Sequence, residues 1–190
     1  LIPFLLVSLA TSFAAAAGVD PNLWLEDIEG AKAIDWVKER NKTSLAELEG
    51  DKRYEPLRQE MRAILNAQDK IAWPSWRGGM IYNFWQDAEH VRGLWRRAAL
   101  AEYRKKDPKW EIILDVDKLG RDENESWVYK GASCRAPLYT KCLLSLSRGG
   151  KDAVVVREFD AALSTFVAGG FAIPEAKHRL EWLSDDELLV

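Results

Sequence analysis

Helical spacing of apolar residues is the first pattern along the chain. After Asp27, apolar side chains recur at roughly helical intervals with charged residues between them, and Asp27 can cap the predicted helix. These positions are Ile34, Trp36, Val37, Leu45 and Leu48. A second stripe, with Pro56 at the first helical position, consists of Leu57, Met61, Ile64, Leu65 and Gln68. We therefore predict an N-terminal helical segment over residues 18–69.

From Ile71 the spacing changes to that of short strands. Runs rich in aromatic and β-branched residues are separated by turn sequences. The first four runs cover 71–76, 80–86, 94–100 and 110–116; the next four cover 127–131, 142–148, 153–160 and 165–171. The tryptophans that lead successive units, Trp73, Trp127 and Trp182, are 54 and 55 residues apart. Near-equal spacing of four-strand units is typical of β-propeller blades, and an eight-stranded flat or sandwich-like sheet is the alternative.

The predicted fold class is mainly β with an N-terminal α-helical segment. Residues 70–190 hold about two blades and the start of a third, whereas closing a propeller ring takes at least about four blades. The last residue, Val190, falls within a predicted strand. We therefore expect an incomplete β-propeller domain that is truncated at its C-terminus, in a chain that is a fragment of a larger protein.

The first seventeen residues are predicted to be a signal peptide. The apolar run "LIPFLLVSLATSF" is too short to span a bilayer comfortably, and the alanines after it suit a signal peptidase site. A start methionine and a charged n-region are both missing. A buried hydrophobic helix is the alternative. The prediction for residues 1–17 implies an exported protein, periplasmic or secreted, with no membrane span in the mature chain.

Composition indicates a soluble globular protein. The chain is 47% hydrophobic and 30% charged, with a net charge of −3, which does not call for nucleic acid as a partner. Nine tryptophans indicate a large interior or a recognition surface. The basic and aromatic stretch 92–110 could form a platform for a single nucleic acid strand. Strand alternation favours a solvated blade edge instead, because it places Leu94 and Arg96 on one face and Trp95 and Arg97 on the other.

Cysteine and histidine usage argues against a metal site. The two cysteines, Cys134 and Cys142, are eight positions apart and suit a disulfide in an exported chain, with free thiols as the alternative. A zinc site needs about four ligands. The two histidines, His90 and His178, lie far from each other and show no ligand spacing. We predict no metal and no cofactor.

Two motifs resemble those of a known family. "DPNLWLED", residues 20–27, resembles the N-terminal signature of the prolyl oligopeptidase family of serine peptidases, where an aromatic residue is often found in place of Asn22. "YNFWQDAEHVRGLWRR", residues 82–97, is similar to a first-blade stretch of the same family. The resemblance extends over residues 20 to about 190, which is nearly all of the predicted mature chain.

The resemblance implies a serine peptidase that acts on short peptides. In that family N-terminal helices and a seven-bladed propeller accompany an α/β-hydrolase domain that carries a Ser, Asp and His triad after the propeller. Cleavage follows proline or, in related subgroups, basic residues. No triad position is assigned here: the local string "GASCR", residues 131–135, lacks the last glycine of a nucleophile elbow. We expect the hydrolase domain to be absent from this chain, which would then be inactive alone.

The segment 20–27 is predicted to dock the missing domain. Trp24 and Leu25 would be buried against it, while Glu26 and Asp27 would cap the next helix or pair with basic groups. The alternative is local packing of Trp24 on its own helix. At the level of function, the propeller would limit access to the catalytic domain, and the alternative is a non-catalytic, exported, β-rich binding module.

Overall fold

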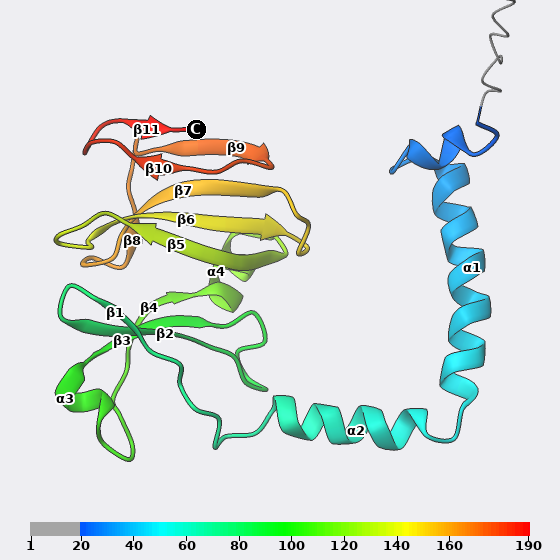
Figure 1. Ribbon diagram of the computed structural model, residues 1–190, viewed down its shortest axis with the longest axis horizontal. Coiled ribbons are helices and arrows are strands. Elements are labelled where there is room, and N and C mark those ends of the chain that lie inside the picture. The colour runs from blue at the N-terminus through cyan, green and yellow to red at the C-terminus, as the bar shows by residue number, and fades with distance from the viewer. Residues whose placement is uncertain (1–19) are drawn as a thin grey trace, which may run out of the picture. The chain divides into compact units, whose positions relative to one another are not determined.

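The computed structural model describes residues 20–190. The chain divides into two compact units, of which one ends at Glu60 and the other spans Met61–Val190. In Figure 1, helices α1 and α2 precede all the strands along the chain. The predicted signal peptide, residues 1–17, lies outside the described residues.

The first unit contains a short 3-10 helix, η1 (Leu23–Glu26), and the long helix α1 (Ala31–Gly50). The prediction that Asp27 caps the long helix is wrong. The N-cap of α1 is Gly30, without a side-chain hydrogen bond, and Asp27 ends η1 instead. The backbone carbonyl of Asp27 accepts from Gly30 N–H at 3.0 Å, so a turn separates the two helices.

Helix α2 (Tyr54–Leu65) is one turn shorter than its apolar stripe predicts. It ends before Gln68, which therefore does not extend the stripe. Pro56 is the third residue of the helix and not the first. At this position the missing N–H of proline removes no hydrogen bond of the helix, because the first four N–H groups of a helix have no intrahelical partner.

The first predicted unit of strands forms one antiparallel sheet in chain order. Its strands are β1 (Ser75–Arg77), β2 (Met80–Trp85), β3 (Leu94–Ala99) and β4 (Glu111–Asp115). Strand β1 begins later than predicted, after Pro74, a residue that cannot donate to a ladder. The predicted alternation of β3 is confirmed, because Leu94 pairs with Trp85 and Arg96 with Asn83.

The second unit forms a separate sheet, so a single eight-stranded sheet is excluded. Its strands are β5 (Trp127–Cys134), β6 (Lys141–Arg148), β7 (Val154–Asp160), β8 (Thr165–Phe166) and β9 (Ala172–Ala176). The predicted fourth strand, 165–171, is wrong in extent: β8 and β9 both pair with β7, and a loop interrupts them. The loop winds around Glu158, whose backbone bonds Val167 at 3.1 Å and Phe171 at 2.8 Å.

Two short helices were not predicted. Helix α3 (Leu100–Tyr103) follows β3, and α4 (Val116–Glu123) joins the two sheets. Asp115 caps α4 by accepting from Lys118 N–H at 2.8 Å, and Asn124 ends it with a left-handed backbone. Asp115 and Asn124, at the two ends of α4, are residue types that favour helix caps, so the sequence contained a signal for this helix. The predicted opening of a third unit is the hairpin of β10 (Glu181–Trp182) and β11 (Leu188–Leu189).

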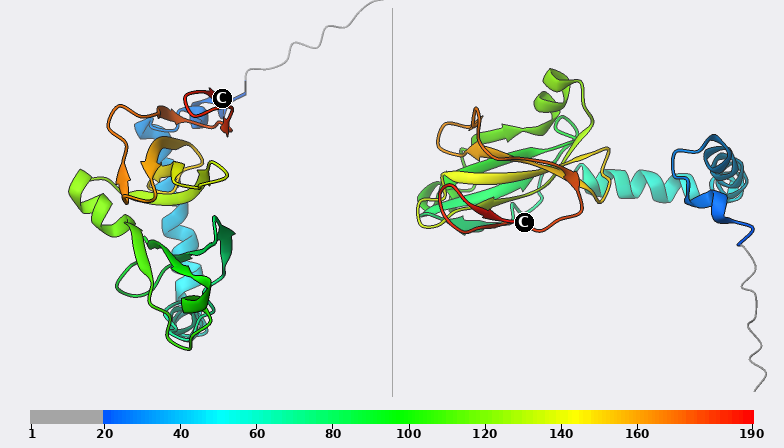
Figure 2. Two further views of the ribbon diagram at one scale, coloured as in Figure 1. Left: turned by 90° about the vertical axis from the view of Figure 1, so that its left-hand side faces the viewer. Right: turned by 90° about the horizontal axis from the view of Figure 1, so that it is seen from above.

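Aromatic side chains fill the space between the two sheets. The ring centroids of Phe84 and Tyr129 are 4.6 Å apart, and Trp95 lies 6.0 Å from Phe159 and 6.1 Å from Tyr129. Figure 2 shows the first sheet, the second sheet and the last hairpin stacked in chain order. Buried aliphatic residues complete this core: Ile113, Leu114, Val116, Leu144 and Leu146.

The leading tryptophans are not structurally equivalent, although their spacing predicted the repeat. Trp127 begins β5 and is buried, whereas Trp73 precedes β1 and is exposed. Trp182 lies in β10. The spacing of the tryptophans therefore matches the succession of strand units, but the three side chains do not occupy the same position in each unit.

Candidate functional site

The predicted docking residues lie in and just after η1. The Trp24 ring meets Trp36 edge to face, with centroids 6.2 Å apart, and the Lys32 ammonium lies 4.2 Å above the Trp24 ring. Trp24 and Leu25 are half-buried, while Glu26 and Asp27 are exposed. Local packing of Trp24 on its own helix is thus present within this unit. Docking against another domain stays a prediction.

An apolar face remains exposed on each of the two long helices. On α1 the exposed side chains are Ile34, Trp36, Val37, Leu45 and Leu48. On α2 they are Leu57, Met61, Ile64 and Leu65. Across both helices Ala33 is the one buried side chain among the described residues. Amphipathic helices obtain most of their stability by burying such a face, so these stripes are the strongest candidates for contact with a further partner.

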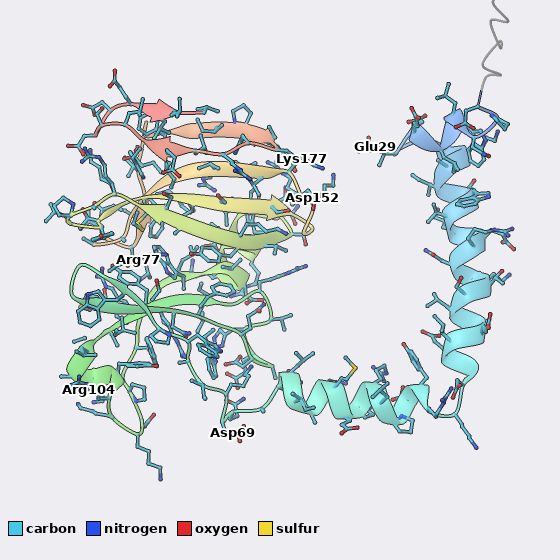
Figure 3. The ribbon with its side chains drawn as sticks, viewed as in Figure 1. Glu29, Asp69, Arg77, Arg104, Asp152 and Lys177 are labelled. Atoms are coloured by element: carbon cyan, nitrogen blue, oxygen red, sulfur yellow. A yellow bond between two sulfur atoms is a disulfide. The ribbon has the colours of Figure 1, made fainter. Side chains whose placement is uncertain are left out.

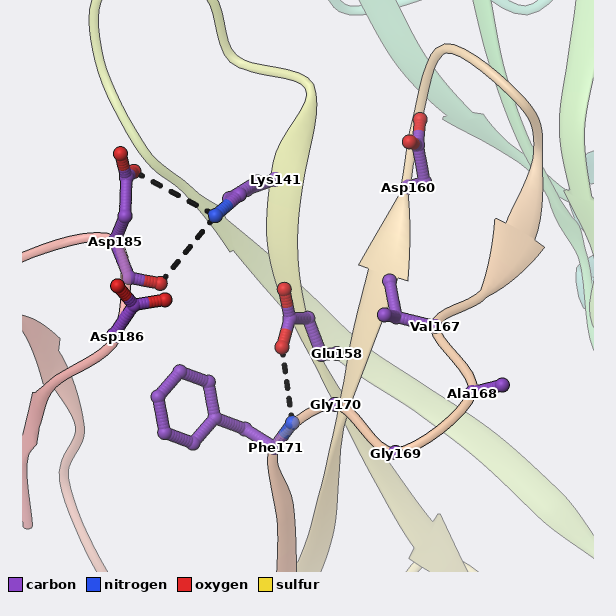
Figure 4. A pocket seen from close by; sticks show the side chains of 10 residues that line it. All are labelled: Lys141, Glu158, Asp160, Val167, Ala168, Gly169, Gly170, Phe171, Asp185 and Asp186. Atoms are coloured by element: carbon purple, nitrogen blue, oxygen red, sulfur yellow. Dashed lines mark hydrogen bonds and ion pairs between the residues drawn. The ribbon is translucent and has the colours of Figure 1, made fainter.

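A second candidate is a pocket between the second sheet and the last hairpin (Figure 4). The cavity measures about 470 Å³. Residues 167–171 of the loop between β8 and β9 form one wall, and the other lining residues are Lys141, Glu158, Asp160, Asp185 and Asp186. Four of these five side chains are acidic, which gives the pocket a negative charge.

Three of the four acidic side chains of this pocket, those of Glu158, Asp160 and Asp185, have partners within the fold. The Glu158 carboxylate accepts from Phe171 N–H at 2.9 Å, and Asp160 accepts from two backbone N–H groups of the next turn. Asp185 binds Arg135 at 2.6 Å and lies 3.8 Å from the Lys141 ammonium. These contacts show that the three carboxylates support nearby loops, and they do not identify a ligand.

Sequence reasoning missed Glu158, the central residue of the pocket. Its side chain is only 8% exposed, and its backbone and carboxylate together hold the loop that interrupts the outer strand. The pair Gly169 and Gly170 in the middle of a predicted strand was the available signal, because glycine inside a strand often marks a bulge or a close approach. A Cβ on Gly170 would lie 2.7 Å from the Glu158 carboxylate.

A stacked arginine lies on the outer face of the first sheet. The Arg96 guanidinium lies 4.4 Å from both the Trp85 and the Trp110 ring centroids and donates to the side-chain oxygen of Asn83 at 2.9 Å. Burial lowers the pKa of Arg96 to about 10, against an opposing effect of the Asp87 charge, so the side chain keeps its charge at neutral pH. This arrangement uses the aromatic rings to hold the cation, and it supports the interpretation of this stretch as a structural blade surface.

The two histidines have different surroundings, and a buried ring nitrogen of His178, Nε2, has no hydrogen-bond partner among the described residues. The His90 ring contacts the Asp87 carboxylate at 3.0 Å, and His178 lies between β9 and β10. Ser133 of the "GASCR" string is inside β5 and not at a turn from strand to helix. Within residues 20–190 no hydrogen bond joins a serine hydroxyl to a histidine ring.

No cluster of three or more His, Cys, Asp or Glu side chains in the described part of the chain is arranged to hold a metal ion. None of the described helices combines the length and the apolar character needed to cross a membrane.

The two cysteines lie opposite each other at the end of the β5 and β6 pair. Their Cα atoms are 4.0 Å apart and their sulfur atoms form a disulfide. Cys142 is fully buried, and Cys134 is half-buried. The bond closes the loop 135–140.

Comparison with known proteins decides the family. The N-terminal β-propeller domain of prolyl oligopeptidase matches residues 10–190. The chain belongs to the prolyl oligopeptidase family. The predicted resemblance and the mainly β, propeller-type fold are thereby confirmed.

Relatives of this prolyl oligopeptidase family member include two bacterial proteins named as peptidases. The chain is 46% identical over 172 residues to an uncharacterized peptidase of Sinorhizobium fredii, covering 90% of this chain and 24% of the relative. It is 38% identical over 149 residues to one of Rickettsia prowazekii, covering 78% of this chain and 20% of the relative. The chain thus spans about a quarter or less of the length of these relatives.

Solved structures give the same assignment. A post-proline cleaving enzyme from Rickettsia typhi superimposes with a TM-score of 0.78 at 33% identity, covering 87% of this chain and 25% of that one. Oligopeptidase B from Leishmania major superimposes with a TM-score of 0.63 at 14% identity, covering 86% of this chain and 23% of that one. The second likeness supports the fold alone.

Proposed function

We propose that the protein to which these residues belong is a serine peptidase that hydrolyses peptide bonds in short peptides. The observation that carries the proposal is the succession of a four-stranded sheet, a five-stranded sheet and a further hairpin in a chain of the prolyl oligopeptidase family. Related proteins are named as peptidases, and the Rickettsia typhi relative is named for cleavage after proline. Cleavage after proline is therefore the first specificity to test.

The propeller portion would act as a filter in front of the catalytic domain. Sheets that pack face to face through aromatic rings form a rigid wall, because the rings are buried and interlocked. A ring built of such blades leaves only a narrow central channel. Folded proteins would be excluded by their size, whereas short peptides would pass.

The helical segment would dock the catalytic domain. The exposed apolar stripes of α1 and α2 resemble the helix faces that globular proteins normally bury against another part of the structure. Trp24 and Leu25, half-buried beside α1, would extend the same contact. Glu26 and Asp27 are exposed and would be free to pair with basic groups across that contact.

The activity can be tested on the protein from its natural source. An antibody against residues 20–190 captures the protein, which is then labelled with a fluorophosphonate probe and weighed. We expect a labelled species several times heavier than this chain, and we expect it to cleave a fluorogenic peptide after proline. An unlabelled species of about the mass of this chain would contradict the peptidase function and favour a non-catalytic binding module.

We also propose that the protein is exported. The support is the apolar run and the alanines of residues 1–17. Sequencing of the N-terminus of the mature protein is expected to begin at or near Gly18. A mature protein that retains residues 1–17 would contradict the proposal.

A further inference from the structure

The first hairpins of three successive strand units lie on one side of the sheets (Figure 1). They are the β1 and β2 hairpin with its turn at Gly78 and Gly79, the β5 and β6 hairpin with its loop at 135–140, and the β10 and β11 hairpin with its turn at 183–187. The middle hairpin contacts both of its neighbours.

Toward the first sheet, the middle hairpin makes close contact with the β1 and β2 turn. Gly78 has a φ of +53°, and a Cβ there would lie 3.3 Å from the Tyr139 ring and 3.4 Å from the Leu138 carbonyl oxygen. Arg77 extends from the end of β1 and donates to Cys134 Sγ at 3.7 Å. Figure 3 shows Arg77 between the two sheets. The two hairpins are therefore in contact at two places: Gly78 lies against Leu138 and Tyr139, and Arg77 contacts a sulfur atom of the disulfide.

Toward the last hairpin, the contacts are polar. Arg135 donates to the Asp185 carboxylate at 2.6 Å, and the Lys141 ammonium lies 3.8 Å from the same carboxylate. The indole N–H of Trp182 donates to the Ser133 carbonyl at 3.1 Å. Ser133, Arg135 and Lys141 all lie within one residue of a cysteine, so their positions depend on the residues that the disulfide joins.

Backbone hydrogen bonds also restrain the loop, and one of them joins it to the end of β7: Ala161 N–H donates to the Thr140 carbonyl at 2.7 Å. The ends of the loop are held by a bond from Arg135 N–H to the Lys141 carbonyl at 2.9 Å, and Tyr139 N–H donates to the Arg135 carbonyl at 2.9 Å. Leu138 at its tip is 77% exposed. The disulfide between Cys134 and Cys142 is the one covalent restraint at the base of this loop. A cross-link chiefly limits the conformations that a loop can reach once its non-covalent contacts open.

We propose that the Cys134–Cys142 disulfide is a redox-sensitive clamp, which fixes the 135–140 loop and through it the contacts of the β5 and β6 hairpin with both neighbouring hairpins. In the oxidised state the three hairpins move as one body. In the reduced state the loop opens locally, and the β1 and β2 turn and the β10 and β11 turn lose their common support. The inference concerns the fold and does not depend on the proposed peptidase function.

The redox step needs a dithiol as the co-reactant. A thiolate of the dithiol attacks Sγ of Cys134, the more exposed of the two, and the bond between the cysteines breaks. Cys142 leaves as a thiolate and takes up a proton. The second thiol of the reductant then displaces Cys134, so that two electrons and two protons pass to the protein and the reductant becomes a cyclic disulfide.

The test compares hydrogen exchange before and after reduction of the protein expressed from its complete gene. Amide exchange is followed by mass spectrometry with and without dithiothreitol, and alkylation establishes that both thiols have become free. We expect exchange about tenfold faster at Arg77 and Met80, which pair across the β1 and β2 turn, and at Leu183 and Ser184, whose N–H groups donate to the Glu187 carbonyl. Exchange in β3 and β4, which lie away from the loop, is expected to stay unchanged and provides the internal control.

A serine variant distinguishes the loss of this disulfide from other effects that the reductant has on the protein. Cys134→Ser cannot form the bond and keeps the buried Cys142, so it is expected to exchange fast at both turns with and without dithiothreitol. Exchange at the turns that is unchanged after full reduction of the wild-type protein would overturn the proposal. So would thiols that alkylate completely before any reductant is added, because the clamp would then not exist in the protein as isolated.

Discussion

The helical segment and the two sheets use the same kinds of apolar residue in opposite ways. In the sheets, large side chains such as Trp95, Leu144 and Phe159 are buried against one another. In α1 and α2 the apolar stripes face outward, and Ala33 is their one buried side chain among the described residues. The sheets therefore have their own core, whereas the helices present a face whose burial would need further contacts.

Removal of Trp95 is the strongest test of the self-sufficient core. Trp95 is 3% exposed and contacts the rings of Tyr82, Tyr129 and Phe159, so Trp95→Ala leaves a cavity between the sheets. We expect the free energy of unfolding to fall by about 3–5 kcal/mol in urea titrations. The matched control is Trp73→Ala at an exposed position, with an expected change within about 0.5 kcal/mol. Equal losses at both positions would contradict the assigned core.

Two glycine substitutions, one beside the packed sheets and one at the end of the exposed helix α1, test the same difference in packing. Gly93, before β3, has a φ of +102°, and a Cβ there would lie 2.4 Å from the Phe84 ring, so Gly93→Ala combines strain with a clash. We expect a loss of about 1–3 kcal/mol in the free energy of unfolding, measured by urea titration. Gly50→Ala at the end of α1 meets nothing within 4 Å and is expected to be neutral or to stabilise by up to about 1 kcal/mol. A neutral Gly93→Ala would contradict the close packing at this turn.

Asp87 gives the sheet unit an acid dependence. Burial raises the pKa of this carboxyl, but hydrogen bonds from the backbone and side chain of His90, the backbone of Glu89 and the Trp85 indole outweigh it and hold the pKa at about 2. Because the folded pKa lies below the ordinary value of 3.8 for an aspartate, the stabilisation is present above about pH 4 and is lost as the pH falls toward 2. We expect a loss of about 1–2 kcal/mol across this window in urea titrations.

The matched variant for this acid dependence is Asp87→Asn. It keeps the size of the side chain and removes the ionisation, so its stability is expected to vary less between pH 4 and pH 2 than that of the wild-type protein. An identical pH profile for the two proteins would show that Asp87 is not the group responsible.

The smallest effect on the sheets is expected from the apolar stripe of α2. Leu57→Gln together with Ile64→Gln changes exposed side chains, so the unfolding of the sheets should shift by no more than about 0.5 kcal/mol. In the protein expressed from its complete gene, we expect proteolytic cleavage between α2 and β1 to become several-fold faster, because docking of the helices is weakened. The control is Arg62→Gln on the same helix. Equal cleavage rates in all three proteins would contradict docking through this stripe.

Much of the local structure followed from the sequence. Apolar spacing predicted two helices before residue 70, and aromatic and β-branched runs predicted the strands of both sheets except β9. Prediction failed where a local signal was weak or where a distant residue decided the outcome. Strand β1 starts after Pro74 because proline cannot donate, whereas the break between β8 and β9 depends on Glu158, which lies on the neighbouring strand.

The sequence by itself determined the order of elements, the repeat of strand units and the family, because these depend on spacing and on short motifs that lie within one segment. Only the tertiary structure decided which tryptophans are buried, and it brought Arg77 to Cys134 and Asp185 to Arg135, residues that lie far apart in the sequence. The physical reason is that burial and contact depend on how sheets pack face to face. Residues with similar local sequence, such as Trp73 and Trp127, therefore reach opposite environments.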